Sequence, residues 1–411
     1  MWGLLFLNVL TFYPTTWTGL PLAVPIPSKV GKVITQGALL GALLAALMLN
    51  RRRLIRPNVF LCLVSLLVLD ALVAAMEAEH LLGTSYRTAR LAMFVAVLWL
   101  LSPWWTRRDL LLVRCHLALT STVLGSVLLG LLVAPRTAMA EGRLAGALWP
   151  IPPTGVAHFA AITIGLMVVF WLSNRASGHV TLLVVAVAGT MLLLTHTRTA
   201  LVGMMAGILV AGLSLFIVKA RARKLLVAAG IVVSIVALTL SSILTAWLTR
   251  GEDTQQLTSL TGRTTVWASI LGAPRNEFQI IFGSGMSNLS FNGLPIDSNW
   301  LAAYNDLGLV GVILCALMLL FPLAAAYFQP RGVKRALALF LVTYCLVSSF
   351  TETGLSDPSL YLLELSLAAS LLVPYGGDNS LATQSAAEAP AVLESVADRS
   401  LPADRLDRRP E

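Results

Sequence analysis

The chain has 411 residues, of which 57% are hydrophobic and 12% are charged, and its mean hydropathy is +0.81. Soluble domains carry about 25% charged residues, so this composition excludes an ordinary soluble protein and indicates repeated membrane spans. The net charge of +9 does not indicate nucleic-acid binding, because most basic residues lie in short links between apolar segments, where they set the orientation of a membrane protein.

The apolar segments predict an all-α fold, a polytopic membrane bundle of about twelve helices. The expected spans cover residues 2–24, 30–49, 57–76, 88–104, 110–133, 156–173, 180–195, 199–218, 225–247, 300–327, 336–352 and 359–374. Prolines interrupt the first span, which is therefore expected to bend or re-enter the membrane. A large polar loop, residues 248–299, separates the ninth span from the tenth.

Basic residues fall in alternate links, and the positive-inside rule places these links in the cytoplasm. The links contain Arg51–Arg53 with Arg56, Arg107 and Arg108, Arg175, Lys219–Lys224, and Arg331–Arg335. Both termini are then cytoplasmic, and the loop of residues 248–299 faces outward. We therefore expect a multi-pass protein of the bacterial cytoplasmic (inner) membrane, with residues 1–375 forming the membrane domain. Residues 376–411, with few large apolar residues, are expected to form a disordered cytoplasmic tail.

Two arginines in separate outward segments are candidates for binding an anion. Arg198 lies in the short link of residues 195–199, where the N–H groups that begin the next helix and a guanidinium both favour an anion. Arg263 opens a predicted short helix along the membrane surface, whose apolar face consists of Val266, Trp267, Ile270 and Leu271. The alternatives stay open: an arginine that extends to the membrane interface, and a solvated arginine on an amphipathic helix.

Three further outward motifs each have two interpretations. Asp297 precedes the tenth span and fits a helix N-cap, a general base, or both. Gly283-Ser284-Gly285 predicts a tight turn in preference to a phosphate-binding loop. Glu77-Ala78-Glu79-His80 is interpreted as the polar end of a helix, with a metal site as the alternative. We expect neither a metal ion nor a cofactor.

Charge is concentrated at the outward face, which favours binding or chemistry there. The candidates for contacting substrate are Arg87, Arg90, Arg143, His158, Trp267 and Asn299. A transporter instead places ionisable groups along a path through the membrane, and only Asp70 and Glu364 stand out as mid-membrane residues of this kind.

The chain resembles the O-antigen ligase and O-antigen polymerase superfamily of membrane glycosyltransferases. The resemblance covers nearly the whole membrane part and depends on the number of spans, the large late outer loop and four local patterns. These patterns are Arg143-Leu144-Ala145-Gly146 before a proline-rich stretch, Thr197-Arg198-Thr199-Ala200-Leu201, Gly262-Arg263 with Trp267, and Asp297-Ser298-Asn299-Trp300-Leu301 followed by Asp306-Leu307-Gly308. Many ligases carry His-Asn or His-Ser where this chain has Asp297-Ser298, a difference that favours a polysaccharide polymerase.

The resemblance implies a GT-C-like bundle that acts on a polyprenyl-diphosphate-linked glycan donor and a glycan or lipid acceptor, in contact with membrane lipids and without a metal ion. Arg198 and Arg263 would hold the diphosphate, and Asp297 would take the proton of the acceptor hydroxyl. Three alternatives stay open: a ligase that passes a glycan to a lipid or protein, a lipid-linked glycan flippase or other transporter, and a scaffold without chemistry.

Overall fold

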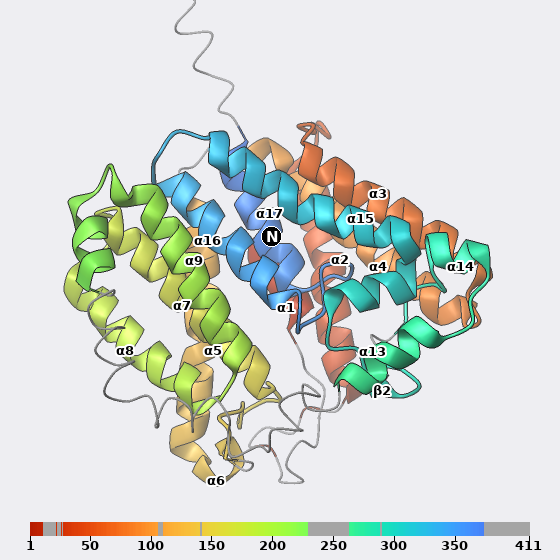
Figure 1. Cartoon of the computed structure of the whole chain (residues 1–411), viewed down its shortest axis with the longest axis horizontal. Helices are drawn as coiled ribbons and strands as arrows, with labels where there is room; N and C mark the ends of the chain where they lie inside the picture. Colours follow the sequence, from red (N-terminus) through yellow and green to blue (C-terminus); the bar gives the residue numbers. More distant parts are fainter. Residues whose placement is uncertain are drawn as a thin grey trace, which may run out of the picture. The chain divides into compact units, whose positions relative to one another are not determined.

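Helices make up nearly all of the regular structure in the computed structural model (Figure 1). The structure describes residues 1–10, 22, 26, 28–105, 110–139, 142–228, 263–287 and 290–373. All of the described helices and strands belong to one unit, Met1–Leu372. The predicted tail, most of the predicted ninth span and the first part of the predicted outer loop lie outside the described residues.

The labels follow Figure 1. The α-helices are α1 (Trp2–Val9), α2 (Ser28–Leu49), α3 (Val59–Ala74), α4 (Leu81–Leu101), α5 (Leu111–Val133), α6 (Pro135–Ala138), α7 (Pro153–Leu172), α8 (Gly178–Leu194), α9 (Arg198–Phe216), α13 (Arg263–Gly272), α14 (Glu277–Phe282), α15 (Asn299–Phe328), α16 (Val333–Ser348) and α17 (Leu360–Leu372). Short 3-10 turns cover Ala75–Glu77 and Ser102–Trp104, and two strands, β1 (Ser290–Phe291) and β2 (Leu294–Pro295), pair antiparallel.

Six helices of the described part are long and apolar enough to cross a membrane: α2, α3 with the turn that follows it, α5, α7, α9 and α15. Helices α8 and α17 are apolar but shorter. The predicted class, an all-α protein with several apolar helices of membrane-spanning length, agrees with this arrangement. The expected total of about twelve spans stays a prediction.

Helix α16 is buried along most of its length and packs against α7, α9, α15 and α17. Its Phe340 fills space that two glycines leave open: a Cβ atom on Gly165 of α7 would lie 1.8 Å from the ring, and one on Gly207 of α9 would lie 2.8 Å from it. Small residues allow helices in membranes to approach closely. This packing fixes the end of α16, where the candidate site begins.

Helix α15 is interrupted, although the sequence analysis predicted one continuous span. Gly308 has φ 61° and ψ −158°, a conformation that is not helical. The break exposes backbone carbonyls, and the turn at Gly283–Gly285 binds two of them: the Ser284 N–H donates to Asn305 O (3.1 Å) and the Gly285 N–H donates to Asp306 O (3.0 Å). These two N–H groups are therefore not available to a phosphate.

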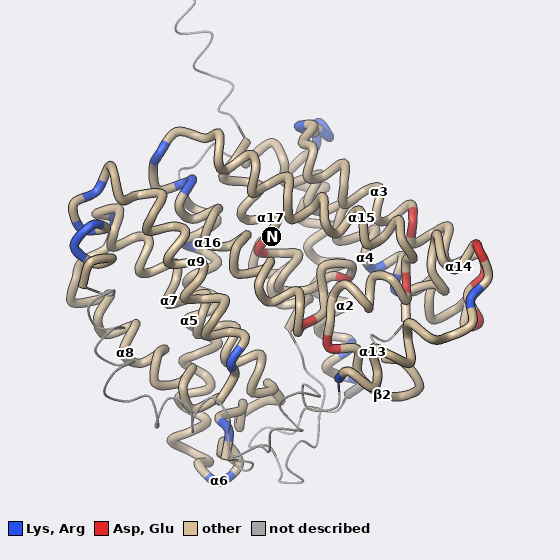
Figure 2. The backbone as a smooth tube through the Cα atoms, in the orientation of Figure 1, with Lys and Arg blue, Asp and Glu red and all other residues tan. Residues whose placement is uncertain are grey.

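The links between helices separate into two ends. At one end, which we call the cationic end, the α2–α3 link bonds to the end of α4 (Arg56 N–H to Ser102 Oγ, 2.8 Å) and the end of α15 bonds to the end of α17 (Gln329 Nε2 to Leu372 O, 2.9 Å). Figure 2 shows Lys and Arg on the α2–α3 and α15–α16 links, whereas many Asp and Glu residues lie toward α13 and α14. The placement of the links on the two sides of a membrane stays a prediction.

The break at Gly308 gives a test of this packing. A Cβ atom at residue 308 would lie 2.4 Å from the carbonyl of Ile281, in a positive-φ backbone. Gly308→Ala is therefore expected to add a steric cost of about 1–3 kcal/mol to a backbone cost of roughly 1–2 kcal/mol. Gly293→Ala, at φ +79° in open space, is the control that carries the backbone cost alone. Thermal unfolding in detergent compares them, and equal midpoints would contradict the close packing at the break.

Candidate functional site

The turn between α16 and α17, residues 349–359, joins segments from across the chain. The backbone N–H of Asn299, at the start of α15, donates to Ser349 O (3.0 Å), and its side-chain Oδ1 accepts from the Leu355 N–H (2.9 Å). The Thr199 hydroxyl, in the first turn of α9, shares a hydrogen bond with Thr351 (2.7 Å). Asn299, predicted to contact substrate, is buried and acts here as a brace for the α16–α17 turn.

Arg263 and Asp297, predicted separately as catalytic residues, form an ion pair with 3.0 Å between Arg263 Nε and Asp297 Oδ2. The pair is partly exposed, with 29% and 39% of the two side chains accessible. The prediction that Asp297 caps α15 is wrong: the N-cap is Ser298, and no side chain provides a cap hydrogen bond. The carboxylate is directed instead to the guanidinium of α13.

Helix α13 places Arg263 by packing its apolar face on the first half of α15. Val266 and Ile270 are buried in a cluster with Ile296 and Ala302, as the predicted apolar face required. That face is wrong at Leu271, which is 66% exposed, because the helix contacts its support along a narrow stripe. Trp267 is half-buried, and its indole N–H has no hydrogen-bond partner among the described residues.

The charges of several predicted site residues change the pKa of the Glu352 carboxyl. Burial raises the pKa of its carboxyl from 4.5 to about 7, and the positive charge of Arg263 opposes that rise. Asp297 raises the same pKa further, while His158 and Arg143 lower it. Sequence analysis gave Glu352 no role. The available signal was a carboxylate in the short link between the last two apolar segments.

Asp357 is the second carboxylate of the α16–α17 turn. Burial raises the pKa of its carboxyl, and the charges of Arg90 and Arg87 lower that pKa. Arg90 also donates to Asn8 O (3.1 Å), which ties α4 to α1. The α16–α17 turn therefore brings Arg87 and Arg90 near the residues that surround Glu352. Both carboxylates line a cavity of about 220 Å³ whose wall also includes His158.

Arg143 supports the link that precedes α9. Its Nε donates to Thr195 O (2.9 Å), and the neighbouring Leu144 N–H donates to Leu194 O (2.9 Å). His196, within this link, has φ 51°. Arg198 begins α9, as predicted. The link is thus held in a tight conformation immediately before Arg198, and Arg143 both fixes it and acts electrostatically on Glu352.

His158 uses both ring nitrogens inside the protein. Its Nε2 lies 2.7 Å from Glu364 Oε1, and its Nδ1 lies 3.1 Å from the Tyr344 hydroxyl. His116 Nε2 lies 3.9 Å from the same Glu364 oxygen. His158 lines the cavity, but its two ring nitrogens are engaged by the buried Glu364 and Tyr344.

No known family model matches the chain, and no curated protein matches it. Within the described part of the chain, no three or more His, Cys, Asp or Glu side chains are grouped so that they could hold a metal ion. The contacts at the α16–α17 turn are therefore the main basis for a functional assignment.

The charges around Glu352 give a prediction that does not depend on function. Removing a cation disfavours the carboxylate, so Arg263→Met should raise the pKa of Glu352 above about 7, whereas Asp297→Asn should lower it. Infrared titration of the carboxyl band, assigned by its loss in Glu352→Gln, measures both shifts. Arg331→Met, at the cationic end, should leave the titration unchanged. An unchanged midpoint in both site variants would show that these charges do not reach Glu352.

Proposed function

We propose that this chain is a membrane glycosyltransferase of the O-antigen ligase and polymerase type. It transfers or polymerises glycans from a polyprenyl-diphosphate-linked donor at the outer face of the bacterial cytoplasmic membrane, and a polysaccharide polymerase is favoured. The observation that carries the proposal is the grouping of arginines from α4, α13 and the link before α7 around two carboxylates of one turn.

The proposed orientation follows from the two ends of the bundle. The cationic end faces the cytoplasm by the positive-inside rule, and the α16–α17 turn then faces outward. The termini are cytoplasmic in this arrangement. A diphosphate head group at the outer leaflet would meet the starts of α9 and α13, since Thr199 contacts Thr351 and the charge of Arg263 acts on the adjacent Glu352.

In the proposed reaction, the acceptor hydroxyl oxygen attacks the anomeric carbon of the donor glycan. The bond from that carbon to the diphosphate oxygen breaks, and the lipid diphosphate leaves with the electron pair. Arg198 and Arg263 stabilise the negative charge that develops on the leaving group, because arginine keeps its proton and supplies a fixed charge. The hydroxyl proton passes to a carboxylate of the site.

Glu352 is the better base, although Asp297 was predicted for that role. A general base works best when its pKa lies near the working pH, and the pKa of Glu352 is about 7. Asp297 is held by Arg263 and is assigned to orienting that guanidinium. The charge of Arg143 acts on Glu352, and the charges of Arg87 and Arg90 act on Asp357.

A transporter of lipid-linked glycans is the second candidate, and the break in α15 at Gly308 favours it, since transporters use discontinuous helices near the membrane midplane. A reconstituted assay separates the candidates by their products. A ladder of longer glycans identifies a polymerase, a single added glycan identifies a ligase, and movement of the donor across the bilayer without a new glycosidic bond identifies a transporter.

Separate replacement of the two arginines tests the diphosphate role. Arg198→Ala and Arg263→Ala are each expected to lower kcat by about 10²–10³-fold, the usual cost of removing one preorganised charge from a transition state. The assay uses protein in lipid nanodiscs with the lipid-linked donor. Arg52→Ala, an exposed arginine of the cationic end, should keep full activity. Near-normal transfer by both site variants would remove the diphosphate role.

The pH dependence tests the base. With Glu352 as general base, kcat/KM should rise about ten-fold per pH unit below about pH 7 and level off above it, because only the carboxylate accepts a proton. Glu352→Gln should lower the rate by about 10²–10⁴-fold and abolish this limb. If Glu352→Gln retains the limb and Asp297→Asn loses it, Asp297 is the base.

A further inference from the structure

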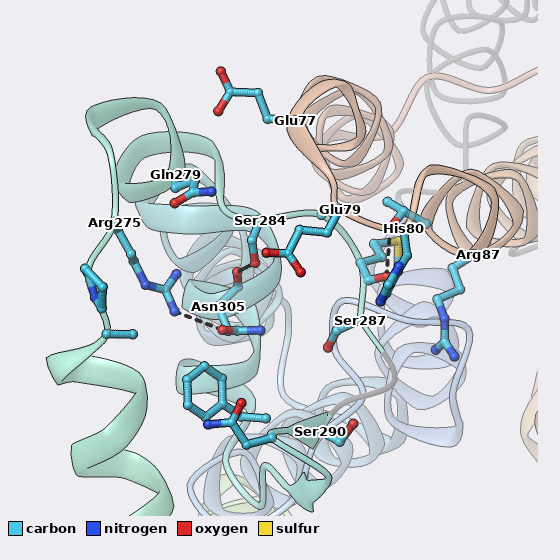
Figure 3. Close-up of a pocket in the computed structure, with 18 residues that line it drawn as sticks. Glu77, Glu79, His80, Arg87, Arg275, Gln279, Ser284, Ser287, Ser290 and Asn305 are labelled. Atoms are coloured by element: carbon cyan, nitrogen blue, oxygen red, sulfur yellow. Dashed lines mark hydrogen bonds between the residues drawn. The ribbon is translucent and has the colours of Figure 1, made fainter.

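Figure 3 shows a second and larger cavity, of about 580 Å³. Its walls come from the end of α3, the start of α4, the α13–α14 link, the turn at Gly283–Ser287 and the β-hairpin. Arg87 connects the two cavities, because it lines this one while its charge acts on Asp357 in the wall of the other. The size lies within the range of small-ligand sites, roughly 300–1,000 Å³.

Contacts between distant parts of the chain hold this cavity open. Asn276 Nδ2, at the N-cap of α14, donates to Glu77 Oε2 in the 3-10 turn after α3 (3.1 Å), and the Thr84 hydroxyl of α4 donates to Met286 O (3.4 Å). Arg275 Nη2 donates to Asn305 Oδ1 (2.8 Å), and its guanidinium lies 4.8 Å from the Tyr304 ring centre. The cavity is therefore formed before any ligand arrives.

The lining suits a ligand without net charge. Two arginines, Arg87 and Arg275, and two glutamates, Glu77 and Glu79, line the cavity, so their formal charges cancel. This lining therefore offers a diphosphate no net electrostatic attraction, whereas the α16–α17 turn gathers several arginines. The two cavities thus differ in the chemistry they accept.

The lining also supplies many donors and acceptors, together with apolar surface. Arginine only donates, a carboxylate only accepts, and serine does both, a combination that fits a ligand with many hydroxyls. Figure 3 shows the Glu79 carboxylate directed into the cavity, with Ser287 and Ser290 on its lower side. Phe291 adds an aromatic surface.

We propose that this cavity binds a neutral saccharide chain, next to the group that holds the lipid diphosphate. The proposal rests on the proposed function, since it assigns the sugar part of the same reaction to a separate subsite. The saccharide can belong to the donor or to the acceptor, and kinetics with the two substrates distinguishes them.

The test fills the cavity with a side chain. Gly83 of α4 lines it and has no atom within 4 Å of an added Cβ, so Gly83→Leu adds an apolar side chain at the cavity wall. Gly189→Leu in α8 is the matched control, because Gly189 is also helical with open space around it. Glu79→Gln is the second variant, which keeps the shape and removes a charge-assisted hydrogen bond.

The probes are the oligosaccharide released by mild acid from the lipid-linked donor, and the bare polyprenyl diphosphate. Gly83→Leu and Glu79→Gln should each weaken binding of the free oligosaccharide by about ten-fold or more and leave binding of the bare lipid unchanged. Arg198→Ala and Arg263→Ala should do the reverse. Gly189→Leu should bind both probes as the unchanged protein does.

The outcomes separate this proposal from the proposed function. If the protein binds the bare lipid but not the oligosaccharide, or if Gly83→Leu binds the oligosaccharide normally, the subsite is overturned and the glycosyltransferase stands. If the protein binds the oligosaccharide but not the bare lipid, and Gly83→Leu and Glu79→Gln weaken that binding, the proposed function fails and the saccharide site remains. A higher KM for the donor or for the acceptor in Gly83→Leu then identifies which saccharide occupies the cavity.

Discussion

The hydrogen bonds of Asn299 to both sides of the α16–α17 turn are the constraint on which the candidate site depends. A buried backbone N–H or C=O without a partner is costly, above all where a membrane excludes water. Asn299 donates its backbone N–H to Ser349 O and accepts the Leu355 N–H at its side-chain Oδ1. These two backbone groups of the α16–α17 turn therefore keep hydrogen-bond partners although they lie outside a helix. Glu352, between the two anchored residues, is thereby held near Arg263, Arg143 and His158.

The interleaving of acids and arginines explains how the proposed anion site is stable before the anion binds. Guanidinium groups brought together alone would repel one another. Asp297 compensates Arg263 at 3.0 Å, in a partly exposed pair of a kind that contributes only about 0–1 kcal/mol to stability. In the proposed reaction, an incoming diphosphate would therefore replace Asp297 at little cost. The same exposure lets Arg263 move toward a substrate while α13 stays packed through Val266 and Ile270.

The sequence predicted the helices, but not the break in α15 or the contacts of the α16–α17 turn. Runs such as residues 30–49, 110–133 and 199–218 agree with α2, α5 and α9 to within a few residues, because apolar length alone defines such helices. The break at Gly308 depends on carbonyls bound by residues 284 and 285, a tertiary contact that no local pattern contains. The role of Glu352 depends on charges from four separate segments. The hairpin, in contrast, carried a readable signal: Asn292-Gly293, with φ 50° and 79°, is the sequence typical of a two-residue turn.

The buried histidines bear on the choice between an enzyme and a transporter. An ionisable residue within a membrane bundle marks a pathway or requires a partner, and Glu364 has His158 at 2.7 Å and His116 at 3.9 Å on one oxygen. With Cys345 Sγ 3.7 Å from its other oxygen, this carboxylate is engaged in fixing the His158 side of the cavity wall. Of the two mid-membrane carboxyls that a transport path would use, Glu364 and Asp70, only Asp70 has no hydrogen-bond partner among the described residues. One isolated group does not form a relay, so the arrangement favours chemistry at the α16–α17 turn over passage through the bundle.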